Sequence, residues 1–149
     1  MYKKKKILAI TLARGGSKGV KDKNIKSICG KPLIFYTIRE AKKSKYIDRY
    51  IVSTDSKKIQ AISKKYGAEA PFLRPKYLSS DAASSVGPLK HAIKWTEKDE
   101  KIRYDIILEL MCTNPLKKSK DIDSIIEKII NTEADSVIAV HRLEDHHPI

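Results

Sequence analysis

Three glycines and several cationic side chains follow directly after an apolar run near the N-terminus of the chain. The segment reads ARGGSKGVKDKN over residues 13–24. Glycines at positions 15, 16 and 19 allow backbone N–H groups to approach an anion closely. The side chains that add positive charge are those of Arg14, Lys18, Lys21 and Lys23. This pattern predicts a polyphosphate site, and the alternative interpretation is a flexible basic turn.

Two common phosphate-binding motifs do not fit this segment. The Walker A pattern GxxxxGK[ST] cannot be placed on it. The dinucleotide pattern GxGxxG also fails, because Ser17 stands where the second glycine is required. The sequence therefore favours neither an ordinary ATPase nor a dinucleotide-binding protein.

Strands and helices are predicted to alternate along the chain that must position this loop. Residues 6–13 form a nearly unbroken apolar run, typical of a strand that is buried on both faces of a parallel sheet. Further strands are expected at 48–55, 105–111 and 136–140, and helices at 32–41, 56–66, 86–97 and 120–131. This order predicts a layered α/β fold with a mostly parallel sheet, in which ligands bind beyond the carboxyl ends of the strands.

Composition narrows the class of protein. The 149 residues fit a single domain, and no apolar run approaches the roughly 20 residues that cross a bilayer. The two cysteines, Cys29 and Cys112, lack CxxC spacing, so a reduced cytoplasmic setting is expected. The net charge of +13 leaves open a basic α/β module that binds nucleic acid. Its lysines are scattered over several elements without interleaved aromatics, which argues against that alternative.

Four blocks, taken together, carry a resemblance to a known family. They read LARGGSKGVKDKNIKSICGKPLI at 12–34, IVSTDSKKI at 51–59, LRPKYLSSDAASS at 73–85 and TNPLKKSKDID at 113–123. In this order and spacing they resemble the acylneuraminate cytidylyltransferases, which are the CMP-sialic acid synthetases and their relatives for other nonulosonic acids. The resemblance implies a Rossmann-like three-layer α/β/α fold of the nucleotide-diphospho-sugar transferase type. It implies that the first loop binds CTP and that CMP is transferred to the anomeric hydroxyl of an acidic sugar.

The resemblance also implies roles for individual residues. Arg14, Lys23 and Asn24 would grip the triphosphate, and Arg14 and Lys23 would stabilise the charge that grows on the leaving pyrophosphate. Arg74, Ala83 and Ser85 would contact the cytidine. The full implied CTP site consists of Ala13, Arg14, Gly15, Gly16, Ser17, Lys23, Asn24, Arg74, Ala83 and Ser85.

Two departures from the family pattern limit what can be carried over. Where the family commonly reads QPTSPLR, this chain reads MCTNPLK, so Met111 replaces a glutamine associated with the sugar. The acceptor is therefore open between a sialic acid, another nonulosonic acid and a different acidic sugar such as Kdo. The chain also ends early for the family, so residues 1–149 are expected to be the N-terminal two-thirds of one cytidylyltransferase domain. The resemblance implies Mg²⁺ and a homodimer, with the metal ligands and the dimer segment further along, so we expect nucleotide binding with little or no CMP-sugar formation.

Two aspartates have alternative interpretations. Asp55 closes the second strand, where it would either face a ligand or cap the next helix. Asp81 lies among the expected cytidine-side residues, and we expect it to organise its loop through short side-chain to backbone hydrogen bonds.

Overall fold

The first apolar run forms the central strand of a parallel sheet. The computed structural model describes residues 1–16, 19–20, 22–79 and 85–140. Strand β1 spans Ile7–Leu12, and its first four side chains are completely buried. It pairs in parallel with β4 (Arg49–Ser53) on one side and with β5 (Ile106–Glu109) on the other. The order β4-β1-β5 places the strand before the glycine-rich loop at the centre of the sheet, and its pairing is parallel, as predicted.

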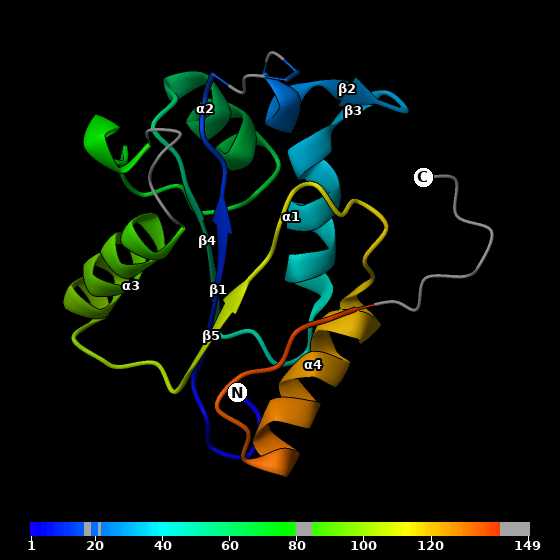
Figure 1. Cartoon of the computed structure of the whole chain (residues 1–149), viewed down its shortest axis with the longest axis vertical. Helices are drawn as coiled ribbons and strands as arrows, with labels where there is room; N and C mark the ends of the chain where they lie inside the picture. Colours follow the sequence, from blue (N-terminus) through cyan, green and yellow to red (C-terminus); the bar gives the residue numbers. More distant parts are fainter. Residues whose placement is uncertain (17–18, 21, 80–84, 141–149) are drawn as a thin grey trace.

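Four helices cover the two faces of this sheet (Figure 1). They are α1 (Leu33–Lys43), α2 (Lys57–Lys65), α3 (Val86–Glu100) and α4 (Ser119–Thr132). Buried residues of α1, α2 and α4 form one core with Ile7, Ala9 and Val52, whereas α3 packs on Leu8, Ile10 and Ile51. The result is the predicted three-layer α/β/α arrangement. In the part of the chain that the structure describes, no helix is both long enough and apolar enough to cross a membrane.

Short elements lie at the carboxyl ends of the strands, which point to the top of Figure 1. They are the 3-10 helices η1 (Lys23–Ile25) and η2 (Lys76–Leu78) and a hairpin of β2 (Ser27–Ile28) and β3 (Lys31–Pro32). Cys29 and Gly30 form the hairpin turn with φ values of 48° and 76°, which two-residue hairpins require. These elements were not predicted, because each is too short to show a periodic pattern in the sequence.

The last predicted strand is wrong. Residues 136–140 have no regular secondary structure, and Ile138 and Val140 are 80% and 87% exposed. Strand preference mostly reflects packing against neighbouring strands, so an apolar run does not become a strand unless a neighbour pairs with it. In the described residues β5 is an edge strand, and 136–140 does not form a ladder with it.

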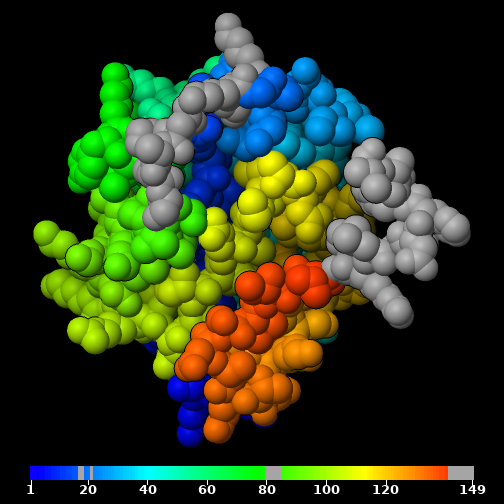
Figure 2. Space-filling view, viewed as in Figure 1, coloured from blue at the N-terminus to red at the C-terminus, as the bar shows by residue number. Residues whose placement is uncertain are grey.

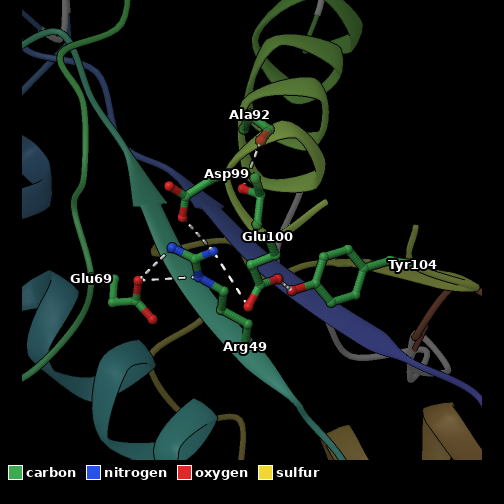
Figure 3. A network of polar contacts seen from close by, with 7 residues as sticks. Arg49, Glu69, Ala92, Asp99, Glu100 and Tyr104 are labelled. Atoms are coloured by element: carbon green, nitrogen blue, oxygen red, sulfur yellow. Dashed lines mark hydrogen bonds and ion pairs between the residues drawn. The ribbon is translucent and has the colours of Figure 1, made fainter. Parts of the chain in front are cut away.

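A polar network fixes the end of the sheet opposite the loops (Figure 3). The guanidinium of Arg49 lies 2.8 Å from Oε2 of Glu69, 3.1 Å from Oδ2 of Asp99 and 3.5 Å from Oε1 of Glu100. Tyr104 donates a hydrogen bond to Glu100. These contacts join the start of β4 to the end of α3 and to the chain that enters β5. They stabilise the scaffold at a distance from the glycine-rich loop.

Candidate functional site

The glycine-rich loop is joined to the neighbouring strand by backbone contacts. The N–H of Ala13 donates to the carbonyl of Ser53 over 3.0 Å, which extends the β1–β4 ladder by one residue. The N–H of Gly15 donates to Oδ1 of Asp55 over 2.9 Å. A Cβ at Gly15 would lie 3.2 Å from Cβ of Ser56, closer than side chains normally approach. The loop thus needs a glycine at this position to lie against the end of β4.

Asn24 closes the other end of the same loop. Its side chain is 7% exposed, and Nδ2 donates to the carbonyl of Arg14 over 3.1 Å. Asn24 therefore shapes the loop from inside, and its buried amide directs the backbone around Arg14. Lys23 precedes it in η1. Burial raises the pKa of Cys112, the residue three positions after β5, and the charges of Lys117 and Lys23 oppose this shift. This electrostatic effect places the Lys23 ammonium near the carboxyl end of β5.

Arg74 is the most deeply buried cation of the candidate site. Its residue is 4% exposed, and its N–H donates to the carbonyl of Thr54 over 2.7 Å. Within the side chain, Nε donates to Oγ of Ser79 over 3.0 Å, and Nη1 lies 3.5 Å from the carbonyl of Ser53. Burial lowers the pKa of Arg74, the nearby Asp55 carboxylate opposes this shift, and Arg14 adds to it. Arg14, Asp55 and Arg74, which come from three separate blocks of the sequence, are therefore electrostatic neighbours.

Lys117 organises the turn that follows β5. Its Nζ donates to Oγ1 of Thr37, to the carbonyl of Met111 and to the carbonyl of Asn114, over 2.8, 2.7 and 2.5 Å. Burial lowers the pKa of Lys117 and raises that of the Cys112 thiol to about 11. The side chain of Met111 projects outward from this turn and is 60% exposed. Met111 and Leu110 line a cavity of about 660 Å³ beside the edge of β5.

These segments surround the end of the central strand. Figure 2 shows blue residues of the N-terminal part of the chain between the green segments and the yellow segment that follows β5. The structure thus gathers Arg14, Gly15, Lys23 and Asn24 from the first block with Arg74 from the third. Gly16 lies in the same loop with φ of 66°. The methyl group of Ala13 belongs to the hydrophobic core, so only its backbone is available to a ligand.

The remaining predicted residues are only partly placed. Ser85 is exposed at the start of α3, where it occupies the N-cap position. Ser17, Ala83 and Asp81 lie outside the described residues. The structure corrects the capping interpretation of Asp55, because Ser56 is the N-cap of α2 and its Oγ accepts from the N–H of Ile59. Asp55 is instead the acceptor for Gly15.

Three residues at this end of the sheet were not predicted as site residues. Lys117 lies in the TNPLKK block, but its three acceptors are contributed by α1 and by the turn itself. Ser53 and His91 have buried polar atoms near Arg74. Ser53 lies in the block at 51–59 without a predicted role, and no motif in the sequence marks His91, whose proximity to Arg74 depends on how α3 lies on the sheet.

Among the described residues near the glycine-rich loop, few side chains could coordinate a divalent cation. The described residues contain no group of three or more histidine, cysteine, aspartate or glutamate side chains that could hold a metal ion. Asp55 lies beside the glycine-rich loop and already accepts the Gly15 N–H. Asp22, at the other end of the same segment, lies 3.7 Å from Nζ of Lys58. The described residues thus do not fit a metal cage.

Comparisons with known proteins show the family of this chain. Residues 8–148 match the family model described as cytidylyltransferase. The chain is 39% identical over 139 residues to a pseudaminic acid cytidylyltransferase of Campylobacter jejuni, a match that covers 93% of this chain and 60% of that protein. It is 41% identical over 118 residues to an N-acylneuraminate cytidylyltransferase of Escherichia coli, covering 78% of this chain and 26% of that protein.

A solved structure supports the fold. It is a CMP:2-keto-3-deoxy-manno-octonic acid synthetase complexed with CTP, with a TM-score of 0.72 at 21% identity. The match covers 87% of this chain and 49% of that one, and at this identity it shows the shared fold alone. The chain spans about 60% of the length of the Campylobacter relative.

Proposed function

Because this chain belongs to the cytidylyltransferase family, within its acylneuraminate branch, we propose that it binds CTP and serves transfer of CMP to a nonulosonic acid. The observation that carries the proposal is the meeting of Arg14 and the Gly15 loop with the buried Arg74 at the carboxyl ends of β1 and β4. An anion-binding loop and a buried guanidinium at one edge of a parallel sheet suit the phosphates and the base of one nucleotide.

The phosphates are assigned to the glycine-rich loop. Arg14 and Lys23 lie at its two ends, and Lys23 also reaches toward the end of β5. In the proposed reaction the anomeric hydroxyl gives up its proton to solvent and its oxygen attacks the α-phosphorus. The bond from the α-phosphorus to the α,β-bridging oxygen breaks, and pyrophosphate leaves with that oxygen. Positive charge held where negative charge grows lowers the barrier to this step. Arg14 and Lys23 are accordingly proposed as the catalytic residues.

The nucleoside is assigned to the α3 side of the loop. Arg74 provides guanidinium donors for the base, and Ser85 lies at the start of the helix that covers this face. Ala83 and Ser17 complete the proposed CTP site with Ala13, Gly15, Gly16 and Asn24. Donors can pair with the acceptor atoms of a pyrimidine, and neighbouring acceptors can distinguish cytosine from uracil.

The acceptor, the metal and the assembly belong to the same proposal. We propose that the acceptor sugar binds beside the turn at Met111. The names of the relatives favour a nonulosonic acid over Kdo as this acceptor. Mg²⁺ is proposed to arrive with the triphosphate, where it would supply charge neutralisation. We propose a cytoplasmic enzyme that acts as a homodimer in its full-length form and that supports the synthesis of cell-surface polysaccharide.

Calorimetry with CTP, UTP, ATP and GTP tests the proposal. CTP is expected to bind more tightly than the other three nucleotides. Equal affinity for all four, or tighter binding of ATP, would overturn the cytidylyltransferase assignment and leave a general phosphate loop. A nucleic-acid-binding module would instead bind oligonucleotides with an affinity that falls steeply with salt, and it would not respond to CTP.

A further inference from the structure

Two buried polar atoms near Arg74 have no hydrogen-bond partner within the described residues. They are Oγ of Ser53 and Nδ1 of His91. Buried polar atoms in native proteins are nearly always paired, and an unpaired one destabilises the fold. Both orphaned atoms are in the region assigned to the nucleoside, so their partners are expected to arrive with the ligand or through a rearrangement that it causes.

The two residues approach Arg74 from different elements. Ser53 ends β4, and its side chain lies on the same face as that of Ile51, which is the face that α3 covers. His91 belongs to α3, and its ring packs edge-on against Phe72 with centroids 4.9 Å apart. Burial lowers the pKa of His91, and the charge of Arg74 lowers it further. A neutral imidazole can accept a hydrogen bond at one nitrogen, as can the serine hydroxyl.

The guanidinium of Arg74 makes one short and one long side-chain hydrogen bond with the described residues. Its Nη1 lies 3.5 Å from the carbonyl of Ser53, which is at the outer limit of a hydrogen bond. Its Nε donates to Oγ of Ser79 over 3.0 Å, so a turn of the planar guanidinium would exchange this bond for new ones. A guanidinium has five N–H donors and no acceptor, so the two orphaned acceptors match its chemistry.

We propose that His91 and Ser53 are positioning residues for Arg74. When the nucleotide binds, the guanidinium turns so that Nδ1 of His91 and Oγ of Ser53 accept its N–H groups and hold it against the base. This inference rests on the proposed function, since it assumes that Arg74 faces the base of CTP. It assigns a role to two residues that neither touch the phosphates nor belong to the glycine-rich loop.

The arrangement has a pH dependence of its own. The charged groups around His91 are Arg74 and, through Arg74, Asp55 and Arg14. Protonated His91 would be a second cation beside Arg74 and could no longer accept its hydrogen bond. The affinity for CTP should thus fall as the pH drops through the pKa of His91. The ratio of CTP to tripolyphosphate affinity isolates this effect, because both ligands share the titration of the phosphates.

A double-mutant cycle tests the proposal by calorimetry with CTP and tripolyphosphate. His91→Phe is expected to lower the CTP affinity about tenfold, the cost of one lost hydrogen bond in a buried site. It should change tripolyphosphate affinity by less than about twofold. In an Arg74→Ala background the same substitution should change CTP affinity by less than about twofold, because His91 acts through Arg74. His91→Asn, which keeps an acceptor, should recover most of the loss.

Thr96→Val is the matched control. Thr96 is also buried on α3, but its hydroxyl bonds to the carbonyl of Ala92 within the helix, so its loss should leave CTP affinity unchanged. Equal effects of His91→Phe in the two backgrounds would overturn the proposal, because His91 would then act independently of Arg74. If His91→Phe does not fold, Ser53→Ala takes its place in the cycle. His91→Asn is then compared with the unmodified chain at low pH, where protonated His91 can no longer accept a hydrogen bond but asparagine still can. Absence of CTP binding by the unmodified chain would instead overturn the proposed function itself.

Discussion

The backbone N–H of Gly15 donates a 2.9 Å hydrogen bond to Oδ1 of Asp55, and this bond joins the glycine-rich loop to the end of β4. Both residues are half-buried, so the carboxylate is partly shielded from water. A charged acceptor on a backbone donor is a strong hydrogen bond. The loop is consequently held in shape before any phosphate reaches it.

Two replacements of Asp55 should separate the effect of its negative charge from the effect of its hydrogen bond to Gly15. Asp55→Ala is expected to lower the free energy of unfolding by about 1.5 kcal/mol, since a charged hydrogen bond is lost. Asp55→Asn keeps an acceptor oxygen and should cost less than half of that. Urea unfolding measures both changes. Asp22→Asn, at a nearby loop carboxylate whose side chain is 40% exposed, is the control and should be nearly neutral. A neutral Asp55→Ala would show that the Gly15–Asp55 bond contributes nothing.

Replacing Arg49 should lower the stability of the fold without affecting the candidate CTP site. Its guanidinium is 11% exposed and bridges three carboxylates at the opposite end of the sheet. Arg49→Met should lower the free energy of unfolding by about 1–2 kcal/mol, because the partner carboxylates lose their cation but remain partly solvated. CTP affinity should stay within about twofold of its original value. Denaturant unfolding and calorimetry measure the two quantities.

The exposed Arg103 supplies the control for Arg49. Arg103→Met removes the same charge from the surface and should change the free energy of unfolding by less than about 0.5 kcal/mol. A loss of CTP affinity in Arg49→Met that matches its loss of stability would mean that the two ends of the sheet are coupled.

Asp105 predicts a contribution to stability that depends on pH. Its Oδ2 accepts the Lys6 N–H over 2.8 Å, and its Oδ1 lies 3.4 Å from Nζ of Lys5. The Lys6 hydrogen bond is the main reason that the pKa of Asp105 falls below its ordinary value of 3.8. A lowered carboxyl pKa stabilises the fold above pH 3.8, and this contribution is lost as the pH falls through the lowered value.

Asp105→Asn should therefore reduce stability at pH 7 but not at strongly acidic pH. Since the side chain is 40% exposed, the expected loss at pH 7 is only about 0.5 kcal/mol. Thermal unfolding of both proteins from pH 7 to pH 2.5 should show their difference shrinking below pH 3.8. A difference that stays constant across this range would assign the effect to packing instead of charge. Asp135→Asn, at an exposed position, provides the control.

Much of the fold could be predicted because its signals are local. The apolar run at 6–13 indicated burial on both faces, and β1 is indeed the buried central strand. The glycines after it indicated close approach of the backbone to an anion, which stays a prediction, and Gly15 lies against Ser56, whose Cβ would be 3.2 Å from an added Cβ. Residues 136–140 carried the same kind of signal, yet they do not form a strand. Whether an apolar run pairs depends on a neighbour in space, which no window of sequence contains.

The parts of the site that could not be predicted depend on contacts between distant segments. Asp55 and Ser56 are both good helix-capping residues, so the sequence alone did not decide which one caps α2. Gly15 lies close to Asp55, so the Asp55 carboxylate accepts the Gly15 N–H and does not cap the helix. Likewise, His91 and Ser53 are unremarkable in sequence and become neighbours of Arg74 only after α3 packs on the sheet.

The last prediction concerns the outer phosphates. Asn24 holds the carbonyl of Arg14, so Arg14 and Lys23 begin at the two ends of one closed loop. If this loop receives the triphosphate, Arg14→Ala and Lys23→Ala should each weaken CTP binding by about 1.5–3 kcal/mol, the range for a charge-assisted contact. CMP lacks the outer phosphates, so its affinity should change much less. Calorimetry with both ligands gives the comparison.

Lys26→Ala is the matched control for these two variants. Lys26 follows η1 directly and is exposed, so its removal changes the net charge by the same amount. It should lower CTP affinity only slightly, and by an amount that higher salt abolishes, because exposed charges are screened. Losses of CTP and CMP affinity that are equal in Arg14→Ala and Lys23→Ala would place both residues at the nucleoside monophosphate. In that case the pyrophosphate would leave from a different part of the site, and these two side chains could not stabilise its charge.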